Sequence, residues 1–408
     1  MLFERPVART RKERIRRAHT IADLRGIARR SVPRFVFDFA DGSADEEVTI
    51  ARARQAFVDV QFNPRVLRDV SMVDTTVTVL GETFARPFAI APTGFTRVLH
   101  ADGELAGARA AGRAGIPFCL STMGTASPEA VRAANRQGSN WFQLYVWSER
   151  ERSTALLHRA WTAGFTVLVV TVDVPVSGRR LRDIRNGFRR PPKGERAALF
   201  SVGLRTIADA APHIRWWVDL LTSPPITFAS MTEEAEDASL LLAKAFDPSV
   251  TFGDLTWIRA AWPGKIMLKG VQSLDDARLA AAHGVDAIVL SAHGGRQLDK
   301  APVPFHLLPV VAREVGADLE VCIDTGILRG DDIVASLALG ARLALVGRAY
   351  TYGLMAGGEC GVTRAIEILG DEIERCMRLL GVTHLAELEP AHVAQLERLV
   401  PRAARLYE

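Results

Sequence analysis

The feature that most constrains the fold is a short apolar segment that recurs along the chain from about residue 85 onward. Each segment ends in polar or glycine residues, and stretches with the apolar period of an amphipathic helix lie between the segments. The eight apolar segments are 87–93, 117–122, 141–146, 166–174, 265–271, 287–293, 320–326 and 343–348. The helical stretches are 102–115, 126–137, 150–164, 274–284, 304–316 and 330–340. This alternation predicts an α/β fold, a (β/α)8 TIM barrel.

An open, doubly wound sheet is the main alternative to the barrel. A dinucleotide-binding sheet of that kind carries a G-x-G-x-x-G motif after its first strand, and this chain has none there. Nothing in the pattern marks a reversal of strand order either, so the barrel is preferred.

Three regions fall outside the repeat. Residues 1–84 are predicted to form an N-terminal helical extension, with one helix capped by Thr20 and ending near Pro33 and a second helix at 43–57. The barrel is expected over 85–385, and 386–408 are expected to form a C-terminal helical tail. About ninety residues separate the fourth and fifth strands. We expect 187–250 to form an insertion over the barrel mouth, because it leaves the carboxyl end of strand four.

Charge and hydropathy limit the location and the partners of the chain. The longest apolar run, 165–176, contains Asp173 and is too short to span a bilayer, and the N-terminus shows no signal peptide, so a cytoplasmic protein is expected. Residues 1–34 hold eleven Arg or Lys and three Asp or Glu, a local charge of +8 that leaves −4 for the rest of the +4 chain. The aromatic residues that single-strand nucleic-acid binders interleave with such charge are missing. A solvated helix face or attachment to an anionic surface is expected, and no nucleic-acid partner.

Polar side chains follow all eight predicted strands, at the end where barrel enzymes build their active sites. A lone strand-end threonine is usually a cap and a lone histidine is usually a core residue, but the grouping at one face indicates a site. Lys269 is informative because the chain has 6 Lys and 45 Arg, and this lysine lies in a buried strand. The strand-end residues are Thr93, Ser121, Gln143, Tyr145, Thr171, Asp173, Lys269, His293, Arg296, Asp324, Gly347 and Arg348.

The loops after the last three strands suggest the chemistry. Residues 324–330 and 346–348 place glycine N–H groups and arginines where barrels commonly hold a phosphate. After strand six, two glycines allow His293 and Arg296 to face one pocket, and a base beside a cation suits a substrate that carries a carboxylate. The sequence shows no metal-ligand spacing, so no metal is expected. Redox chemistry would then use an organic cofactor, and flavin mononucleotide (FMN) suits these loops.

Several motifs make the chain resemble one family. They are Trp141-Phe-Gln-Leu-Tyr145, Thr171-Val-Asp-Val-Pro175, Gly178-Arg-Arg180 followed by Asp183-Ile-Arg-Asn186, Leu268-Lys-Gly270, and His293-Gly-Gly-Arg-Gln-Leu-Asp299. Over about residues 20–385 the chain resembles the FMN-dependent L-2-hydroxy acid dehydrogenases and oxidases, which include glycolate oxidase. In pattern it is most similar to the L-lactate dehydrogenase and (S)-mandelate dehydrogenase members.

The resemblance implies a role for each site residue. His293 would be the catalytic base, oriented by Asp173, and Tyr145 would hydrogen-bond the reacting oxygen. Arg180 and Arg296 would clamp the substrate carboxylate. The implied cofactor contacts are Lys269 at flavin N1 and O2; Thr93, Gly94, Ser121, Gln143 and Thr171 at the ring; and Asp324, Gly326, Arg329, Gly347 and Arg348 at the ribityl chain and phosphate.

The chain departs from the family pattern at three positions. Phe39 replaces a tyrosine that helps to bind the substrate carboxylate, Ala292 replaces an asparagine, and Leu328 replaces the first of two phosphate-loop arginines. These changes favour a larger, more apolar 2-hydroxy acid, mandelate-like or lactate-like, over glycolate. Met123 is predicted to form a wall of its side-chain pocket.

The insertion and Gly94 bear on the electron acceptor. Oxidases of the family tend to carry alanine at the position of Gly94, so a dehydrogenase that passes electrons to quinone or another non-oxygen acceptor is expected. An oxygen-using oxidase, a non-redox FMN barrel enzyme and an inactive ligand-binding homologue remain alternatives. The predicted membrane contact, within 210–230, comprises Trp216, Trp217, Leu220, Leu221, Ile226 and Phe228 beside Arg215. A peripheral position on the inner membrane face is therefore expected, with a subunit contact as the alternative, and the family implies a homo-oligomer, a tetramer.

Overall fold

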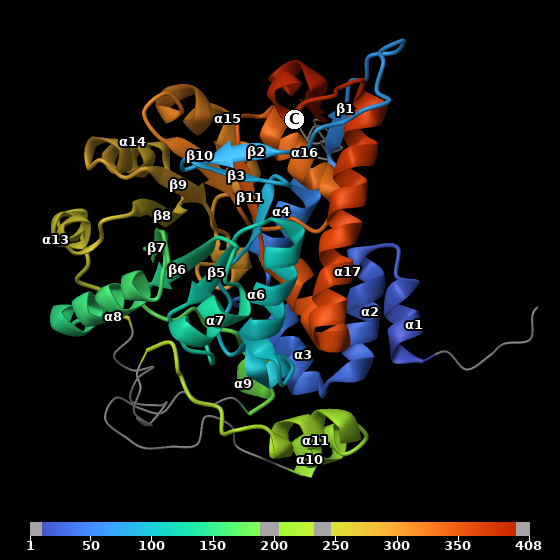
Figure 1. Cartoon of the computed structure of the whole chain (residues 1–408), viewed down its shortest axis with the longest axis vertical. Helices are drawn as coiled ribbons and strands as arrows, with labels where there is room; N and C mark the ends of the chain where they lie inside the picture. The colour runs from blue at the N-terminus through green and yellow to red at the C-terminus, as the bar shows by residue number, and fades with distance from the viewer. Residues whose placement is uncertain (1–9, 188–203, 232–245, 397–408) are drawn as a thin grey trace, which may run out of the picture.

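The computed structural model describes residues 10–187, 204–231 and 246–396. Its centre is a closed barrel of eight parallel strands, in the order β10-β11-β4-β5-β6-β7-β8-β9 (Figure 1). All eight predicted strands are present: β4 (Phe88–Ile90), β5 (Phe118–Ser121), β6 (Asn140–Leu144), β7 (Val167–Thr171), β8 (Lys265–Val271), β9 (Ala287–Leu290), β10 (Glu320–Ile323) and β11 (Leu343–Val346). They are buried almost throughout, which explains their continuous apolar sequences. The predicted TIM barrel is therefore confirmed.

The helices of the repeat form a ring around the barrel (Figure 1). The six predicted helices correspond to α6 (Gly103–Ala114), α7 (Pro128–Ala134), α8 (Arg150–Thr162), α14 (Leu274–Ala282), α15 (Pro304–Val315) and α16 (Gly330–Ala338). The ring also holds α13 (Asp254–Ala261) and the long α17 (Arg348–Leu380), and short helices α5 (Thr96–Leu99) and α9 (Leu181–Arg185) follow β4 and β7. Gly357 and Gly358 interrupt α17 with non-helical backbone angles. No helix in these described ranges is long and apolar enough to cross a membrane.

The N-terminal extension begins with helices and ends with strands. Its helices are α1 (Arg11–Arg16), α2 (Ile21–Ser31), α3 (Arg34–Asp41) and α4 (Val48–Val58). Thr20 and Asp23 form the predicted capping box of α2, which lies along α17 (Figure 1). The second predicted helix starts later than expected, because Asp45 and Glu47 adopt positive φ angles in a turn. The sequence analysis did not predict α1 or α3.

The prediction that the whole N-terminal extension is helical is wrong for residues 60–84, which form strands. They contain β1 (Val60–Phe62) and a hairpin of β2 (Val77–Val79) and β3 (Glu82–Phe84), which turns through Gly81 at a φ of 84°. Val79, Leu80 and Phe84 of this hairpin pack against the apolar residues of the barrel interior. The alternating apolar side chains thus close one end of the barrel, and this burial favours strands over helix.

The C-terminal prediction also differs from the structure in its described part. Of residues 386–408, the short 3-10 turn Pro390–His392 and the strand β12 (Val393–Gln395) are described, after another 3-10 turn at Leu385–Glu387. β12 pairs antiparallel with β1, so this part of the tail is extended rather than helical. Val393 is buried by that pairing. Residues 397–408 lie outside the described residues.

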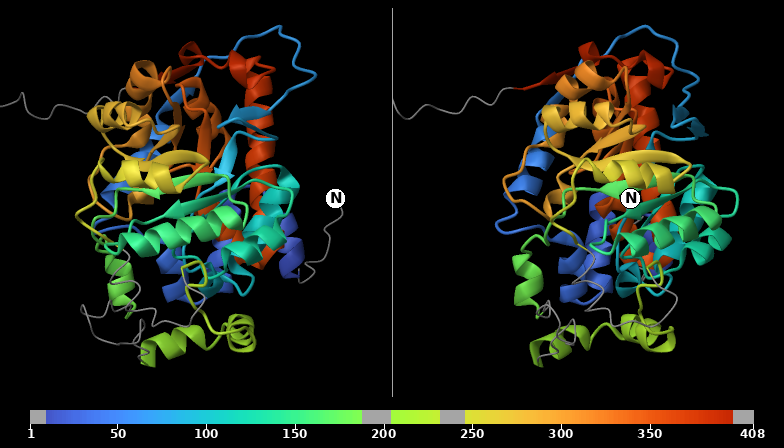
Figure 2. Two further views of the ribbon diagram at one scale, coloured as in Figure 1. Left: turned by 60° about the vertical axis from the view of Figure 1, so that its left-hand side comes forward. Right: turned by 90° about the vertical axis from the view of Figure 1, so that its left-hand side faces the viewer.

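The described part of the insertion forms α10 (Leu204–Ala210) and α11 (Ile214–Thr222) at one end of the molecule (Figure 2). It contacts the loops that follow β4 and β5. The Trp216 indole donates to the Val98 carbonyl over 2.9 Å, and the Phe228 ring packs edge-on against Phe95 at 4.5 Å. Ser230 donates to the Thr122 carbonyl. Residues 188–203 and 232–245 of the predicted insertion lie outside the described residues.

Candidate active site

A cavity of about 420 Å³ opens at the carboxyl ends of the strands. This volume is typical of small-molecule and cofactor sites. Fifteen of the predicted site residues line it: Phe39, Thr93, Gly94, Ser121, Met123, Tyr145, Thr171, Arg180, Lys269, His293, Arg296, Asp324, Gly326, Gly347 and Arg348. Gln143, Asp173 and Arg329 are not among the lining residues. The strand ends therefore bring most of the predicted residues together.

His293 and Asp173 form a hydrogen-bonded pair beside this cavity. The His293 Nδ1 and Asp173 Oδ1 atoms are 2.9 Å apart, and the carboxylate is almost fully buried. Burial alone would raise the pKa of Asp173, but the charge of His293 and its hydrogen bond outweigh burial and lower that pKa. An ionised Asp173 accepts the proton on Nδ1, which leaves Nε2 of the His293 imidazole as the nitrogen that can take up a proton from a substrate. The pair has the arrangement of a general base and its orienting group.

Lys269 places a permanent positive charge at the cavity floor. Its Nζ atom is 2.9 Å from Asp324 Oδ2 and 2.9 Å from Ser291 Oγ. Burial alone would lower the pKa of this ammonium, but the charges of Asp324 and Asp173 raise the pKa above its usual value. The lysine is therefore charged at neutral pH, and it can stabilise negative charge that develops in the cavity.

Arg180 and Arg296 converge on the ring of Phe39. Their guanidinium carbons lie 5.7 Å and 5.4 Å from the ring centroid. Arg180 donates from Nε to Asp183, and Arg296 donates from Nη1 to the carbonyls of Phe39 and Gly42. No hydrogen bond within the described residues uses the terminal nitrogens of Arg180 or the Nη2 of Arg296.

The charge of this arginine pair favours an anionic ligand. Burial, and then the charge of Arg180, lower the pKa of Arg296 to about 9, because a second cation is unfavourable beside the first in this partly buried site. A carboxylate would relieve that cost and accept hydrogen bonds from the remaining guanidinium donors. The geometry therefore supports the predicted carboxylate clamp.

Two buried donors point to a heteroaromatic ligand. Gln143 Oε1 accepts hydrogen bonds from Ser121 Oγ and the Thr122 amide, so Nε2 is the free end of the side chain. In the described structure Gln143 Nε2 and Thr171 Oγ1 are buried with no hydrogen-bond partner. Buried polar atoms are rarely left unpaired in proteins. A flavin ring, with its carbonyl oxygens and nitrogens, would satisfy both atoms.

Gly94 packs closely against Met123 in the cavity wall. A Cβ atom at Gly94 would lie 2.5 Å from the Cβ of Met123, so a side chain at residue 94 would displace Met123. Phe95 and Phe246 also line the cavity, although the sequence analysis did not identify them. Phe95 could have been identified from the sequence, because this aromatic residue directly follows Gly94 at the end of a predicted strand.

The end of the cavity at Arg54 and Arg348 has the positive charge that a phosphate requires. The positions and partners of its arginines, however, differ from the prediction. Arg348 is anchored to protein acceptors, the carbonyls of Asp41, Gly42 and Gly294 and the Ser43 hydroxyl. Arg329 lies outside the cavity, half-exposed, and pairs with Asp331 at 2.8 Å. The unpredicted Arg54 lines the cavity instead. The amino end of α17, where the N-cap residue Gly347 has no side chain to cap the helix, supplies backbone donors that suit an anion.

These features fit FMN. Within the residues that the structure describes, no three His, Cys, Asp or Glu side chains are grouped to hold a metal ion. The fold and the unpaired donors at its mouth define the class: a flavin-dependent barrel oxidoreductase. Residues 28–395 match the family described as FMN-dependent dehydrogenase, and the chain belongs to that family. Its cofactor is FMN.

Known relatives cover almost the whole chain. The protein named "Putative L-lactate dehydrogenase" of Mycobacterium tuberculosis is 57% identical over 402 residues, 98% of this chain and 95% of that protein. The L-lactate dehydrogenase of Caulobacter vibrioides is 42% identical over 93% of this chain and 98% of its own length. Among solved structures, a monotopic membrane protein, (S)-mandelate dehydrogenase, is 36% identical with a TM-score of 0.87 and covers 93% of this chain and 100% of its own. The family assigned from the sequence motifs is confirmed.

Proposed function

We propose that the protein oxidises an L-2-hydroxy acid to the 2-keto acid, with FMN as the first electron acceptor. The observation that carries this proposal is the pair of arginines, with guanidinium donors that no described residue uses, beside the hydrogen-bonded His293 and Asp173. The relatives named above as L-lactate and (S)-mandelate dehydrogenases act on acids of this class. Binding, proton removal and electron acceptance then occur in one cavity.

The chain's residues would divide the reaction as follows. Arg180 and Arg296 bind the carboxylate and fix the position of the α-carbon. Burial, and then the charge of Asp173, raise the pKa of Tyr145 to about 12, so its hydroxyl stays protonated and can donate to the reacting oxygen. His293 takes a proton at Nε2, and Asp173 stabilises the imidazolium that forms. FMN, when bound, supplies the two-electron acceptor, and Lys269 would stabilise the charge gained there.

An apolar wall supports a substrate larger than glycolate. Phe39, Phe95, Met123, Val174 and Phe246 line the cavity near the arginines. The ring centroids of Phe95 and Phe39 lie 6.2 Å apart, edge to face, and Phe95, Met123 and Phe246 belong to one hydrophobic cluster. We infer a 2-hydroxy acid with an apolar side chain, mandelate-like or lactate-like.

The test is anaerobic reduction of the purified holoenzyme by a panel of L-2-hydroxy acids. We expect the flavin absorbance to bleach within the dead time of manual mixing for at least one of them, with the D-enantiomer as the control. Lack of bleaching by every acid in the panel would contradict the proposed function.

For the acceptor we infer a quinone, reached from a membrane surface. Ile207 of α10 and Ile214, Val218 and Leu221 of α11 are exposed, the last three at 69%, 52% and 75%. Their spacing in α11 places them on one face of the helix. Trp216 and Phe228, which the sequence analysis assigned to the membrane face, are instead buried against the barrel loops. The exposed face, not the tryptophans, is therefore the proposed contact.

An oxygen-using oxidase is the second candidate. Gly94 in the cavity lining and the exposed apolar face of α11 are the two features that favour a quinone instead. The predicted homo-tetramer stays a prediction, and the cytoplasmic side of a membrane is the location we propose.

A further inference from the structure

One short helix connects the insertion to the substrate arginine. α3 has eight residues and is about 12 Å long. At its carboxyl end, Arg296 Nη1 donates to the Phe39 carbonyl over 2.8 Å and to the Gly42 carbonyl over 3.0 Å. The last carbonyls of a helix lack partners within the helix and carry the negative end of its dipole, so they are natural acceptors for a guanidinium.

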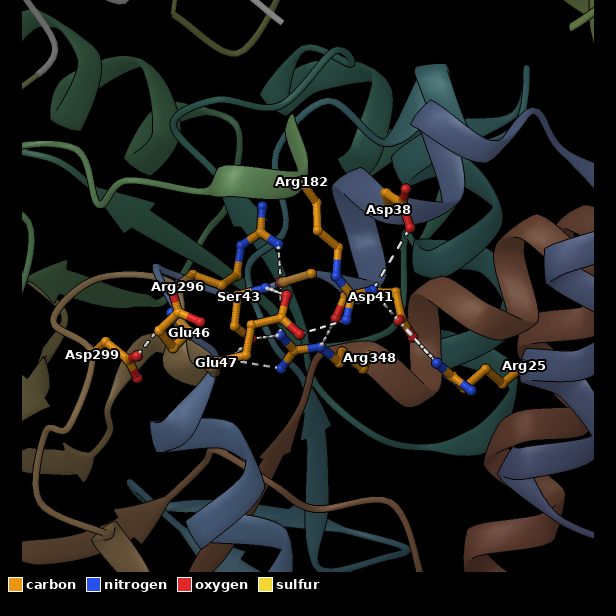
Figure 3. A network of polar contacts seen from close by, with 12 residues as sticks. Arg25, Asp38, Asp41, Ser43, Glu46, Glu47, Arg182, Arg296, Asp299 and Arg348 are labelled. Atoms are coloured by element: carbon orange, nitrogen blue, oxygen red, sulfur yellow. Dashed lines mark hydrogen bonds and ion pairs between the residues drawn. The ribbon is translucent and has the colours of Figure 1, made fainter. Parts of the chain in front are cut away.

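Arg348 strengthens the same junction. Its guanidinium donates to the carbonyls of Asp41 and Gly42, so two partly buried arginines share the end of α3 (Figure 3). Gly42 has no room for a larger residue there, because a Cβ atom would lie 2.7 Å from the Asp38 carbonyl oxygen. Any shift of α3 along its axis would therefore move the acceptors that fix Arg296.

The amino end of α3 is held by the insertion. Pro33 precedes the helix and provides no side-chain cap. Asp209 of α10 supplies one instead, because its Oδ2 accepts the Arg34 amide over 2.6 Å. This carboxylate lies at the positive end of the helix dipole, where anions are stabilising. In addition, the Phe35 ring packs edge-on against Trp216 of α11 at 5.8 Å.

We propose that Asp209 and Trp216 are positioning residues for substrate binding, which act through α3 on Arg296 and on the ring of Phe39. The inference rests on the proposed function, since it takes Arg296 as a carboxylate ligand. The segment that we assign to the membrane surface is then also the segment that sets the geometry of the carboxylate clamp. Displacement of α10 and α11 weakens substrate binding without touching the catalytic base.

The experiment measures oxalate binding to the FMN-loaded enzyme by the change in flavin absorbance, and KM and kcat for the best substrate. Oxalate is a suitable probe because it carries the carboxylate but has no α-hydrogen to lose. Asp209→Ala should weaken oxalate binding and raise KM by about three- to tenfold, the range expected for loss of a helix cap, while kcat changes less than twofold. Trp216→Phe should weaken oxalate binding about two- to threefold.

Two comparisons separate positioning from a general structural effect. Asp209→Asn keeps an acceptor for the Arg34 amide and should restore oxalate affinity to within twofold of the wild type. Asp219→Ala is the matched control: Asp219 lies in the same insertion, and no hydrogen bond in the described structure joins its carboxylate to α3. In an Arg296→Lys background, Asp209→Ala should have less than a twofold effect, because coupled residues are not additive.

Wild-type oxalate affinity in both Asp209→Ala and Trp216→Phe would overturn the proposal, as would an equal effect of Asp209→Ala in the wild-type and the Arg296→Lys backgrounds. Failure of the wild-type enzyme to bind oxalate or to be bleached by a 2-hydroxy acid would contradict the proposed function instead.

Discussion

At the scale of single residues, the His293–Asp173 pair gives the sharpest prediction. His293→Gln should retain FMN and bind oxalate within about tenfold of the wild type, because the arginines remain. The rate of flavin reduction should fall by about 10²–10⁴, the usual cost of losing a general base. Stopped-flow reduction under anaerobic conditions measures this rate. A rate close to the wild type would remove His293 from the mechanism.

Phe39 gives a second residue-scale prediction. The two guanidinium carbons lie 5.7 Å and 5.4 Å from the centroid of its ring, so a hydroxyl on the ring would add one donor for the carboxylate. The added atom would also narrow the cavity beside the larger side chain of mandelate, so Phe39→Tyr should tighten lactate relative to mandelate by up to the value of one hydrogen bond, about 0.5–1.5 kcal/mol. KM values for both acids check this. Equal changes for the two acids would show that residue 39 does not act on substrate size.

The sequence predicted the strand-end residues well, but it did not predict the partners of two arginines in the phosphate loops. Thr171 and Lys269 have positions fixed by strands of clear pattern, so their meeting at one face followed from the barrel. The guanidiniums of Arg329 and Arg348 reach several ångströms from their backbones, and local partners decide their direction. Asp331 holds Arg329 at the surface, and the end of α3 holds Arg348. Neither partner could be inferred from spacing.

At the scale of elements, an ion-pair network joins the extension to the barrel loops and predicts a pH-dependent stability (Figure 3). Asp41 accepts from Arg25, Arg182 and Tyr352. Burial opposes ionisation of Asp41, but these partners lower its pKa to about 2, from 3.8. Ionised Asp41 therefore stabilises the folded protein at pH values above the pKa that this group has in the unfolded chain. This stabilisation is lost as the pH falls toward 2.

Asp41→Asn should accordingly destabilise the protein by about 2 kcal/mol at pH 7, and the difference should shrink to about half near pH 3. Urea unfolding of both proteins across this pH range measures the free energies. Asp69→Asn is the control, since Asp69 is an exposed carboxylate whose contact is local, with Ser71. A pH-independent difference for Asp41→Asn would show that lost packing, not ionisation, causes it.

Element predictions succeeded where the sequence pattern and the tertiary contacts agree. The eight strands and six helices of the repeat have clear periods, and the barrel buries the faces that these periods predict. α3 follows Pro33 without a side-chain cap, and its missing cap comes from Asp209, 175 residues along the chain. β12 forms only by pairing with β1. Such long-range partners leave no local signal.

At the scale of the whole molecule, one exposed apolar face is expected to decide where the enzyme works. Ile214, Val218 and Leu221 are exposed on one side of α11, which lies at one end of the molecule (Figure 2). Apolar faces of this kind insert into the interface of a bilayer, and nearby Arg residues favour anionic lipids. We therefore predict salt-sensitive co-sedimentation with vesicles that contain anionic lipid.

Replacing Ile214, Val218 and Leu221 together by serine should abolish this co-sedimentation and leave anaerobic flavin reduction by substrate unchanged, because none of the three lines the cavity. Reoxidation of the reduced wild-type enzyme should be faster with a quinone in vesicles than with air, and the triple variant should lose that advantage since it no longer meets the lipid-borne acceptor. Leu279→Ser, at an exposed position on α14, is the matched control. If the intact protein stays in the supernatant at low salt and air reoxidises it as fast as quinone, the oxidase function replaces the dehydrogenase, and the face on α11 becomes a contact between subunits.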